Sequence, residues 1–399
     1  MKNTILTLFF LFFLGILNAQ KLITPIESQS GLFNEEERKA FEEFSKNDFV
    51  KDVKTVRFAN IREAITDGYI SFSLPENEQE IRMKVINSEF QDENNFEYSA
   101  EEQEDGEANG GYLNLNNTGG YISGSIQLAS DFYRIFPISP ECQVIISFNK
   151  DLEATCGTEI SSKQPEAAAE CVMGKTGCTT NVLILYSQKA LTELPAGYST
   201  TASSLLSFGN SLISQMNTAM KNSKITHKVT LAGIETIPDA SFTGTAEQEL
   251  DKYSVLLAIS STKTAQLMRI KKADLVVFLT KGEKYNDVAG KAYGLATSTD
   301  KPLAVVKMSY ALARMTFAHE VGHLFGADHG KNDPQPGQSP ARGYYLDASI
   351  GTMMTYASNR IQYFSNPDVK YNKKATGTKD DFNACIIQKN GCAVSQIMK

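Results

Sequence analysis

The chain has 399 residues, of which 42% are hydrophobic and 21% are charged. This composition is typical of a folded protein, and the length suggests two or three domains. The formal net charge of −7 argues against nucleic acid as a partner, because proteins that bind nucleic acid present a basic surface.

The first 20 residues, MKNTILTLFFLFFLGILNAQ, combine one lysine, an apolar run from Ile5 to Leu17 and the small residue Ala19. These are the three parts of a secretory signal peptide. The run is shorter than the roughly 20 residues that a membrane span needs, and no later segment has a comparable one. We therefore predict that residues 1–19 are a cleaved signal peptide and that the protein is secreted by bacterial export, with no membrane span in its mature form.

Six cysteines follow the predicted signal peptide, and they can form disulfides in an exported chain. The sequence does not select among the alternative pairings. Two short-range pairs are sterically allowed, Cys171 with Cys178 and Cys385 with Cys392.

The region after the predicted signal peptide mixes helical and extended segments. A charged helix is expected within residues 34–50 and strands within residues 69–75, 121–139 and 142–148, where β-branched and aromatic residues are enriched. Residues 88–111 are acidic with few large apolar side chains, which favours a solvated loop or hairpin tip.

Residues 160–178 contain mainly small, polar and turn-forming residues, which predicts a linker and a domain boundary. After residue 178 the sequence pattern predicts alternating strands and helices, which indicates an α/β domain. The expected elements are a buried strand over 181–187, a helix over 201–223, a strand over 227–237, and a helix followed by a buried strand over 265–280. The boundaries that we expect are 20–175 for the first domain and 176–399 for the second.

Three of the four histidines of the chain stand within eleven residues, in the stretch FAHEVGHLFGADHG. Periodicity predicts one helix over residues 309–325, with Ser309 as its N-cap. His319 and His323 are four residues apart on this helix, so both imidazoles leave the same face. Glu320 lies beside them, where its carboxylate can act as a general base on a water molecule at a metal.

The third histidine, His329, follows a glycine at which the helix is expected to stop. Gly326 can adopt the left-handed backbone conformation that ends a helix and turns the chain. The turn lets His329 return as a third ligand. Three histidines leave one tetrahedral position on Zn²⁺ open, which is the arrangement of a catalytic site. We therefore predict one catalytic zinc ion, while the sequence says nothing about structural calcium.

The five positions from His319 to His329 spell H-E-x-x-H-x-x-G-x-x-H, which resembles the extended zinc signature of the metzincin metallopeptidases. This clan also carries a Met-turn, a tight turn whose methionine lies beneath the zinc. The stretch GTMMTYA stands downstream, where Met354 matches the family methionine and Met353 is the alternative. The resemblance implies an α/β (α+β) metzincin fold, with a twisted, mostly parallel sheet, an active-site helix and a small C-terminal subdomain.

Residues 179–372 are more specifically similar to the reprolysin, or adamalysin-like, group in its bacterial secreted form. The similarity covers the strands at 181–187 and 271–280, the segment 293–309, the helix with the histidines, and the segment 360–372. One position departs from the group, because Gly330 stands where reprolysins usually carry an aspartate after the third histidine.

The resemblance implies hydrolysis of peptide bonds in proteins or peptides by a monomeric zinc endopeptidase, with Glu320 as the catalytic base. It further implies that substrate lies along an edge strand around Gly294, Leu295 and Ala296 and pairs by main-chain hydrogen bonds. Tyr356 matches a tyrosine that binds zinc or stabilises the oxyanion in other branches of the clan, and that has no such role in most reprolysins.

Secreted metzincins are commonly made as zymogens, which makes residues 20–175 a candidate β-rich propeptide domain. Cys156 followed by Gly157 resembles a cysteine switch, in which a propeptide thiolate occupies the open zinc position. The alternative is a disulfide, for example with Cys142.

A different hypothesis is a secreted binding or adhesion protein in which the metzincin domain is a catalytically idle scaffold. The presence of Glu320 together with the third histidine favours the enzyme. The sequence does not determine which side chains the enzyme would prefer in its substrates.

Overall fold

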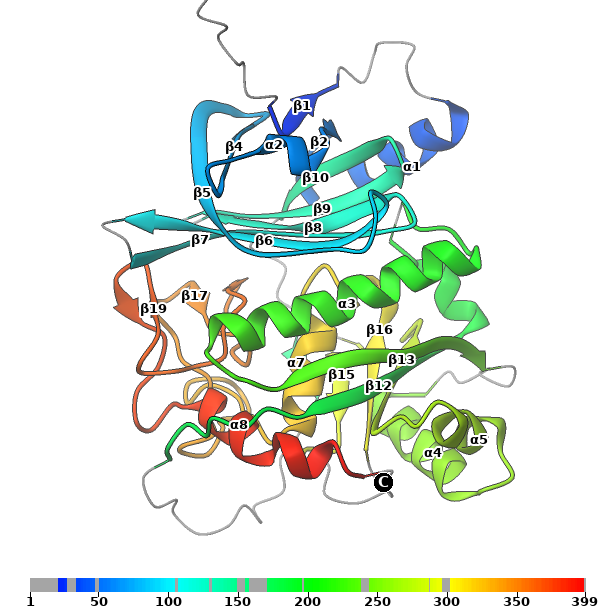
Figure 1. Cartoon of the computed structure of the whole chain (residues 1–399). Coiled ribbons are helices and arrows are strands. Elements are labelled where there is room, and N and C mark those ends of the chain that lie inside the picture. The colour runs from blue at the N-terminus through cyan, green and yellow to red at the C-terminus, as the bar shows by residue number, and fades with distance from the viewer. Residues whose placement is uncertain are drawn as a thin grey trace, which may run out of the picture.

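The computed structural model describes residues 21–26, 34–46, 50–104, 107–128, 131–148, 155–157, 171–195, 197–237, 244–286, 288–295 and 302–397. The predicted signal peptide, most of the predicted linker and Ala296 lie outside these residues. The described chain forms two regions stacked on each other (Figure 1): an N-terminal region of residues 21–148 and a C-terminal region of residues 155–397. No helix among the described residues is long and apolar enough to span a bilayer.

The N-terminal region is a ten-stranded sheet in the order β1-β2-β10-β9-β8-β7-β6-β5-β4-β3, and its strand pairs are antiparallel. Its strands are β1 Ile23–Pro25, β2 Val50–Phe58, β3 Ile65–Thr66, β4 Tyr69–Leu74, β5 Asn77–Phe90, β6 Asn95–Glu104, β7 Glu107–Thr118, β8 Tyr121–Leu128, β9 Asp131–Ser139 and β10 Cys142–Phe148. Two helices accompany the sheet, α1 Glu35–Ser45 and the single turn α2 Ile61–Ala64. Asn34 caps α1, because its side chain accepts the Glu37 N–H and the Glu37 side chain accepts its backbone N–H.

Of the two alternatives predicted for residues 88–111, the solvated loop is wrong, whereas the hairpin agrees with the structure. Apart from the turn at 91–94, the described residues of this stretch belong to β5, β6 and β7, which pair as consecutive hairpins of the sheet. Side chains alternate across β6, so Phe96, Tyr98 and Ala100 are buried while Glu97 and Ser99 between them face the other side. The acidic composition of this stretch obscured the alternation of buried and outward-facing side chains that indicates a strand.

The C-terminal region contains a six-stranded sheet in the order β11-β15-β16-β14-β12-β13. Its strands are β11 Thr155–Cys156, β12 Thr179–Ser187, β13 Lys228–Ile237, β14 Leu275–Thr280, β15 Val288–Ala292 and β16 Leu303–Lys307. The four strands from β16 to β13 run parallel, β15 is antiparallel to β16, and β11 lies parallel to β15 at the edge. The mixed α/β class predicted for this region is confirmed.

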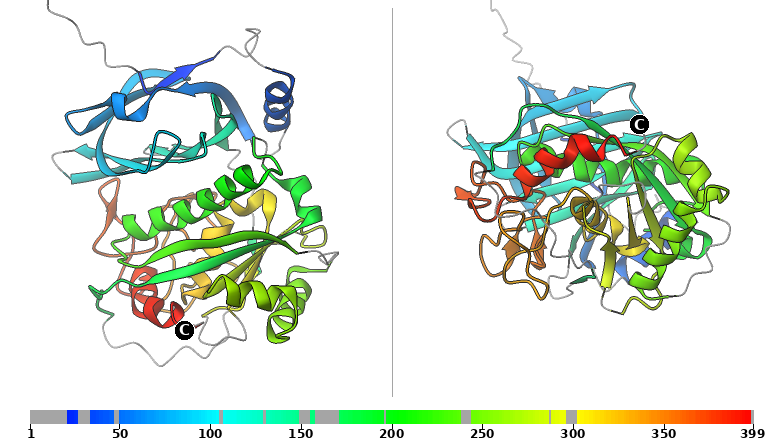
Figure 2. Two further views of the ribbon diagram at one scale, coloured as in Figure 1. Left: turned by 45° about the vertical axis from the view of Figure 1, so that its right-hand side comes forward. Right: turned by 90° about the horizontal axis from the view of Figure 1, so that it is seen from below.

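Helices cover both faces of this sheet, as the sequence of β12 dictates. Val182 and Ile184 join the core under α3 Ala202–Asn222, while Leu183 and Leu185 join the core under α4 Ala246–Ala258. The short helices η1 Gln188–Glu193 and α5 Lys263–Ile270 complete this part of the fold. Figures 1 and 2 show α3 lying between the two sheets, with the N-terminal sheet on its outer side.

The single helix predicted over residues 309–325 is broken in two. α6 spans Met308–Ala311 and α7 spans Thr316–Leu324, with Met315 in the left-handed conformation at φ 57° between them. Ser309 therefore lies inside α6 rather than at its N-cap. The break is supported from outside the helix, since Arg360 Nη2 donates to the Arg314 carbonyl at 2.6 Å. Periodicity could not reveal a break that depends on this distant arginine.

The C-terminal part consists of short pairs and one helix. They are β17 Ile350–Gly351, β18 Asn359–Arg360, β19 Lys370–Tyr371, β20 Lys374–Ala375 and α8 Asn383–Val394.

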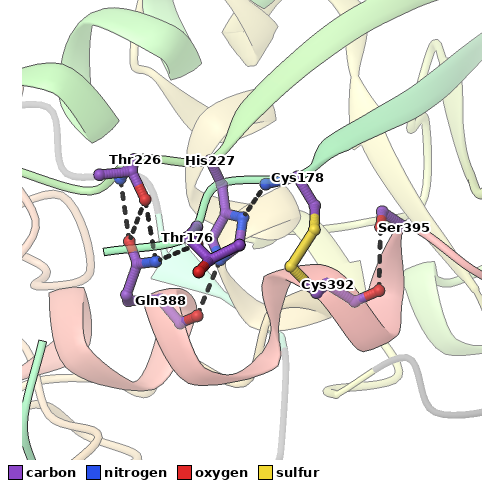
Figure 3. The surroundings of a disulfide bond; sticks show 7 residues. All are labelled: Thr176, Cys178, Thr226, His227, Gln388, Cys392 and Ser395. Carbon is purple, nitrogen blue, oxygen red and sulfur yellow. Dashed lines mark hydrogen bonds between the residues drawn. A yellow bond between two sulfur atoms is a disulfide. The ribbon is translucent and has the colours of Figure 1, made fainter. Parts of the chain in front are cut away.

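Two disulfides attach α8 to the segment that precedes β12. They are Cys171–Cys385 and Cys178–Cys392, so both short-range pairs suggested by the sequence are wrong. His227 strengthens the attachment: its Nδ1 accepts the Cys178 N–H at 2.8 Å and its Nε2 lies 2.7 Å from the Gln388 carbonyl (Figure 3). The two segments run side by side, which pairs cysteines across them instead of within each.

We expect loss of one disulfide to cost about a third of the free energy of unfolding that loss of both costs. With one bridge intact, the second closes a loop of only about 15 residues, worth about 3 kcal/mol, whereas the first closes a sequence separation of 214 residues. Equilibrium urea unfolding of the double variant Cys178→Ala/Cys392→Ala, compared with the variant lacking all four cysteines, measures the difference. Cys142→Ala, which removes an unpaired cysteine, is the control. The same loss in free energy of unfolding on removing the first bridge as on removing the second would contradict this account.

Candidate active site

α7 carries two of the three clustered histidines, and the turn after it positions the third. The helix ends in a Schellman motif, in which the Gly326 N–H donates to the His323 carbonyl and the Ala327 N–H donates to the Gly322 carbonyl. Gly326 has φ 89°, so the left-handed turn predicted at this glycine is confirmed. The chain then brings His329 back against the helix.

The three imidazoles point their Nε2 atoms at one common position. The three Nε2 to Nε2 distances are 3.2 Å for His319 and His323, 3.3 Å for His319 and His329, and 3.0 Å for His323 and His329. A tetrahedral zinc ion at 2.0–2.1 Å from each nitrogen would separate the nitrogens by about 3.3 Å. The donor set and its spacing therefore fit zinc.

Each imidazole is oriented by a backbone carbonyl that accepts from its other ring nitrogen. The Nδ1 to oxygen distances are 2.9 Å from His319 to Met353, 2.8 Å from His323 to Ala327 and 3.1 Å from His329 to Gln335. A proton on Nδ1 leaves the Nε2 lone pair free for a metal, and a carbonyl acceptor raises the basicity of the ligand.

Burial keeps these imidazoles neutral. Loss of hydration lowers the pKa of His319 and His323 well below the usual range and lowers the pKa of His329 to about 4. The neutral ring is the form that binds a metal ion.

Cys156 lies at the same point, on the side that the histidines leave open. Its Sγ is 3.5 Å from His323 Nε2, and the sulfur and one nitrogen from each histidine all lie within 4.8 Å of one another. A zinc ion with a thiolate at 2.3 Å would separate sulfur from nitrogen by about 3.5 Å. Neither Cys156 nor Cys142 takes part in a disulfide, so the alternative of a disulfide between them is not formed.

The backbone around Cys156 is held as an added strand. Thr155 and Cys156 pair with Val288 and Gly290 of β15, and the Gly157 N–H donates to the Gly290 carbonyl at 2.9 Å. β15 is therefore the edge that receives this segment. Gly294 and Leu295 follow the end of β15, where Leu295 packs against the hydrophobic core.

The two methionines of the predicted Met-turn have different positions. The Met354 side chain is buried beneath α7, and a Cβ added to Gly322 would lie 2.6 Å from its sulfur. Met353 instead supplies the carbonyl that orients His319. The absence of a side chain at Gly322 makes room for Met354 next to His323.

Tyr356 also reaches the histidine cluster. Its ring packs edge-on against His329 with centroids 4.9 Å apart, and its hydroxyl donates to the Cys156 carbonyl at 2.5 Å. Burial raises the pKa of the phenol, so the hydroxyl is a hydrogen-bond donor at neutral pH.

Glu320 is fully buried on the side of α7 that faces β15. A Cβ added to Gly290 would come within 2.8 Å of both Cγ and Oε1 of Glu320. Gly290 thus allows the edge strand to approach this carboxylate closely, a role that the sequence alone did not suggest.

Asp333 is a second residue that sequence reasoning missed. Its carboxylate accepts the Gly330 N–H at 2.6 Å, the Tyr356 N–H at 3.2 Å and the Tyr345 hydroxyl. A Cβ at Gly330 would lie 2.9 Å from Asp333 Oδ2 and 2.8 Å from the Tyr345 ring. The aspartate expected from the reprolysin pattern thus has no room at position 330, and a carboxylate three residues later lies beside it. No local pattern marks Asp333, which stands in an irregular loop.

Arg360 brings a buried cation to the site. Its Nη1 lies 3.2 Å from His319 Nδ1, and the carbonyl of Arg314 accepts from its Nη2. Burial, followed by the nearby Arg314, lowers the pKa of Arg360 to about 10, so the guanidinium stays charged at neutral pH.

A second group of metal-ligating side chains, formed by Cys178, His227 and Cys392, differs from the first. Its two sulfurs form a disulfide and both ring nitrogens of His227 have backbone partners. The oxidised group therefore offers no thiolate to a metal.

The site has the features of the zinc peptidase class. These are an α/β sheet, a helix with two histidines and a glutamate, and a third histidine beyond a glycine turn. The family comparison agrees, since residues 181–365 match Metallo-peptidase family M12 of reprolysin type. The matched residues make up less than half of the chain, and the match supports a metzincin-type zinc metallopeptidase domain over this region.

Bacterial relatives carry the same region. The chain is 26% identical over 274 residues to a protein of Xanthomonas campestris pv. campestris named Peptidyl-Asp metalloendopeptidase, covering 65% of this chain and 63% of the relative. Two Stenotrophomonas maltophilia proteins of the same name are 25% and 26% identical over 66% and 65% of this chain, and 64% and 63% of their own lengths. The chain thus spans less than two thirds of the length of these relatives.

A solved structure titled "Structure of a chaperone-substrate complex" also aligns with the chain. The TM-score is 0.45 and the identity is 15%, over 69% of this chain and 39% of that one.

We expect Asp333→Ala to weaken zinc binding by about 10- to 100-fold, because loss of an outer carboxylate loosens the loop of His329 and the Tyr356 segment. Competition for zinc with a chromogenic chelator measures the affinity. Asp380→Ala, which removes an exposed carboxylate near the same subdomain, should leave it unchanged. An unaltered affinity in Asp333→Ala would show that the carboxylate does not support the site.

Proposed function

We propose that the chain is a secreted zinc endopeptidase, made in a latent form that its own N-terminal region inhibits. The observation that carries this proposal is the convergence of three oriented imidazoles beside Glu320, with the sulfur of Cys156 at the remaining position. A zinc ion held by the imidazoles would supply Lewis-acid polarisation of a peptide carbonyl and would make water more acidic.

Glu320 is the proposed general base of this site. It takes one proton from the attacking water, whose oxygen forms the new bond to the peptide carbon, and it returns that proton to the departing amine nitrogen as the C–N bond breaks. Its buried position next to Gly290 keeps the carboxylate away from bulk water.

Tyr356 is proposed to assist by donating a hydrogen bond to the substrate. Its hydroxyl already donates to a peptide carbonyl, that of Cys156, at 2.5 Å. A substrate carbonyl at this place would receive the same donor, which is the geometry required to stabilise a developing oxyanion.

Substrate is proposed to pair with the edge strand that now holds β11. Main-chain hydrogen bonding at Gly290 supports this position, because the Gly157 N–H donates there and another extended chain could do the same. The segment around Gly294, Leu295 and Ala296 stays a prediction for the neighbouring part of the cleft.

Latency is supported by the surface on which the N-terminal sheet lies. The outer face of α3 is lined with serine, threonine and glutamine, whereas its inner face is apolar. Hydrogen bonds join this region to the N-terminal sheet: Ser123 to Ser211 at 2.6 Å, Asn114 to Thr218 at 2.7 Å and Gln362 to Ser125 at 3.0 Å. A helix face of this composition can be exposed to water without penalty, which suits a cover that is later removed.

The disulfides determine which residues would stay attached to the enzyme when the N-terminal region is cleaved off. Cys156 lies in the site, whereas Cys171 is bonded to α8. Cleavage between these residues would free the inhibitory segment and leave residues 171–178 attached to the enzyme. Disulfides also support export to an oxidising compartment, as the predicted signal peptide does.

The names of the bacterial relatives suggest a substrate class. We extend the activity in those names, peptidyl-Asp metalloendopeptidase, to this chain and propose that it cleaves peptide bonds next to aspartate. The alternative of an idle scaffold for adhesion is not favoured by a family match to metallopeptidases.

We expect Glu320→Gln to lower kcat by at least about 100-fold in the processed protein, because the amide cannot carry the proton. Chelator-sensitive cleavage of casein measures activity, and metal analysis should show zinc still bound. Glu283→Gln changes an exposed carboxylate and serves as the control. Full activity of Glu320→Gln would contradict the role of Glu320 as the base. Zinc-loaded wild type that cleaves no peptide of a broad library would contradict the proposed peptidase activity.

We expect the full-length protein to be nearly inactive and Cys156→Ala to raise its activity without any cleavage of the chain, because the fourth position would lose its thiolate. Initial rates on a quenched fluorescent peptide, with intact chain verified on gels, provide the measurement. Cys142→Ala removes the other cysteine that is in no disulfide, and this variant should stay latent. Full-length wild type as active as its processed form would contradict latency.

A further inference from the structure

A cavity of about 240 Å³ lies between the N-terminal sheet and the C-terminal region, beside the histidine cluster. On the side of the C-terminal region it is lined by Ala313, Arg314, Met315, Ser358, Asn359 and Arg360. These residues come from the break before α7 and from the segment that follows Tyr356. The cavity is large enough for a short side chain together with several water molecules.

Arg360 connects this cavity to the reaction centre. Its guanidinium contacts the His319 ring at 3.2 Å and is fixed by the Arg314 carbonyl. No ion pair among the described residues includes Arg360, although its side chain is largely buried. The charge of Glu320 acts on Arg360 from beyond ion-pair distance, and a buried guanidinium without a direct carboxylate contact is costly unless it serves a ligand.

The N-terminal region covers the cavity with a wall of mixed charge. Glu76 and Asp131 contribute carboxylates to this wall, and Lys51 contributes an ammonium group. Acidic groups thus lie on the wall opposite the two arginines. Removal of the N-terminal region would open the cavity and leave its arginine side.

We propose that Arg360, with Arg314 beside it, binds the carboxylate of the substrate aspartate next to the bond that is cleaved. This inference rests on the function proposed above and names the residue that would select its substrate. A planar guanidinium holds a carboxylate through two parallel hydrogen bonds and discriminates it from the neutral amide of asparagine.

The position of Arg360 limits both the place and the length of the acidic side chain. Arg360 contacts His319 at Nδ1 and lies within electrostatic range of Cys156, Glu320 and Tyr356, so a carboxylate bound to it would belong to a residue near the reacting peptide bond. A short side chain meets this requirement, which favours aspartate over glutamate.

The test uses the full chain after processing between Cys156 and Cys171, with quenched peptides that differ only in carrying Asp, Asn or Glu at one position on either side of the bond. We expect wild type to prefer Asp to Asn by about 10- to 100-fold in kcat/KM, the range of a charged hydrogen bond. In Arg360→Gln this ratio should fall toward one, and Arg360→Lys should retain part of it. Arg269→Gln, on the distant α5, is the control for loss of a positive charge.

A second measurement avoids turnover. The processed Glu320→Gln variant should bind the Asp peptide more tightly than the Asn peptide by fluorescence anisotropy, and the added substitution Arg360→Gln should abolish the difference. Circular dichroism and zinc content check that the variants are folded.

The outcomes separate this inference from the proposed function. Cleavage of peptides without preference for Asp, or an unchanged Asp to Asn ratio in Arg360→Gln, would overturn the role of Arg360 and leave the peptidase intact. Arginine-dependent binding of Asp peptides by a wild type that cleaves none of them would support the role of Arg360 in binding aspartate and overturn the peptidase.

Discussion

Three histidines that share one point must each be turned so that a bare nitrogen faces it, and much of the C-terminal region follows from this requirement. Each ring donates its other N–H to a carbonyl from a different turn, at Met353, Ala327 and Gln335. The turn after α7, the loop after His329 and the turn around Met354 must therefore all keep their places together. Glycines at positions 322 and 326 allow the close approach and the reversal of the chain that this needs.

The same constraint supports the proposal that one position serves both latency and catalysis. Cys156, the Tyr356 hydroxyl and the Gly290 edge meet around the point that the histidines leave open. An extended chain placed there gains main-chain bonds whether it is the inhibitory segment or a substrate. The polar face of α3 complements this arrangement, since hydrogen bonds to the N-terminal sheet can be exchanged for bonds to water at little cost.

Features that depend on short-range geometry could be predicted from the sequence. The shared face of His319 and His323 follows from the helical period, the reversal at Gly326 follows from its backbone freedom, and the two-sided burial of β12 follows from a continuous apolar run. Predictions failed where distant segments decide. The break at Met315 is supported by Arg360, and each cysteine of α8 pairs with a cysteine of the segment that precedes β12 because this segment lies against the helix.

The sequence by itself therefore determined the metal-binding residue types, their order and the class of chemistry, because ligand spacing on a helix is a local property. Only the tertiary structure decided which groups surround them. Asp333 replaces the missing carboxylate beside Gly330, and Arg360 reaches His319 from a segment 41 residues away. Both contacts join loops whose paths depend on packing and long-range hydrogen bonds, and neither leaves a periodic pattern in the sequence.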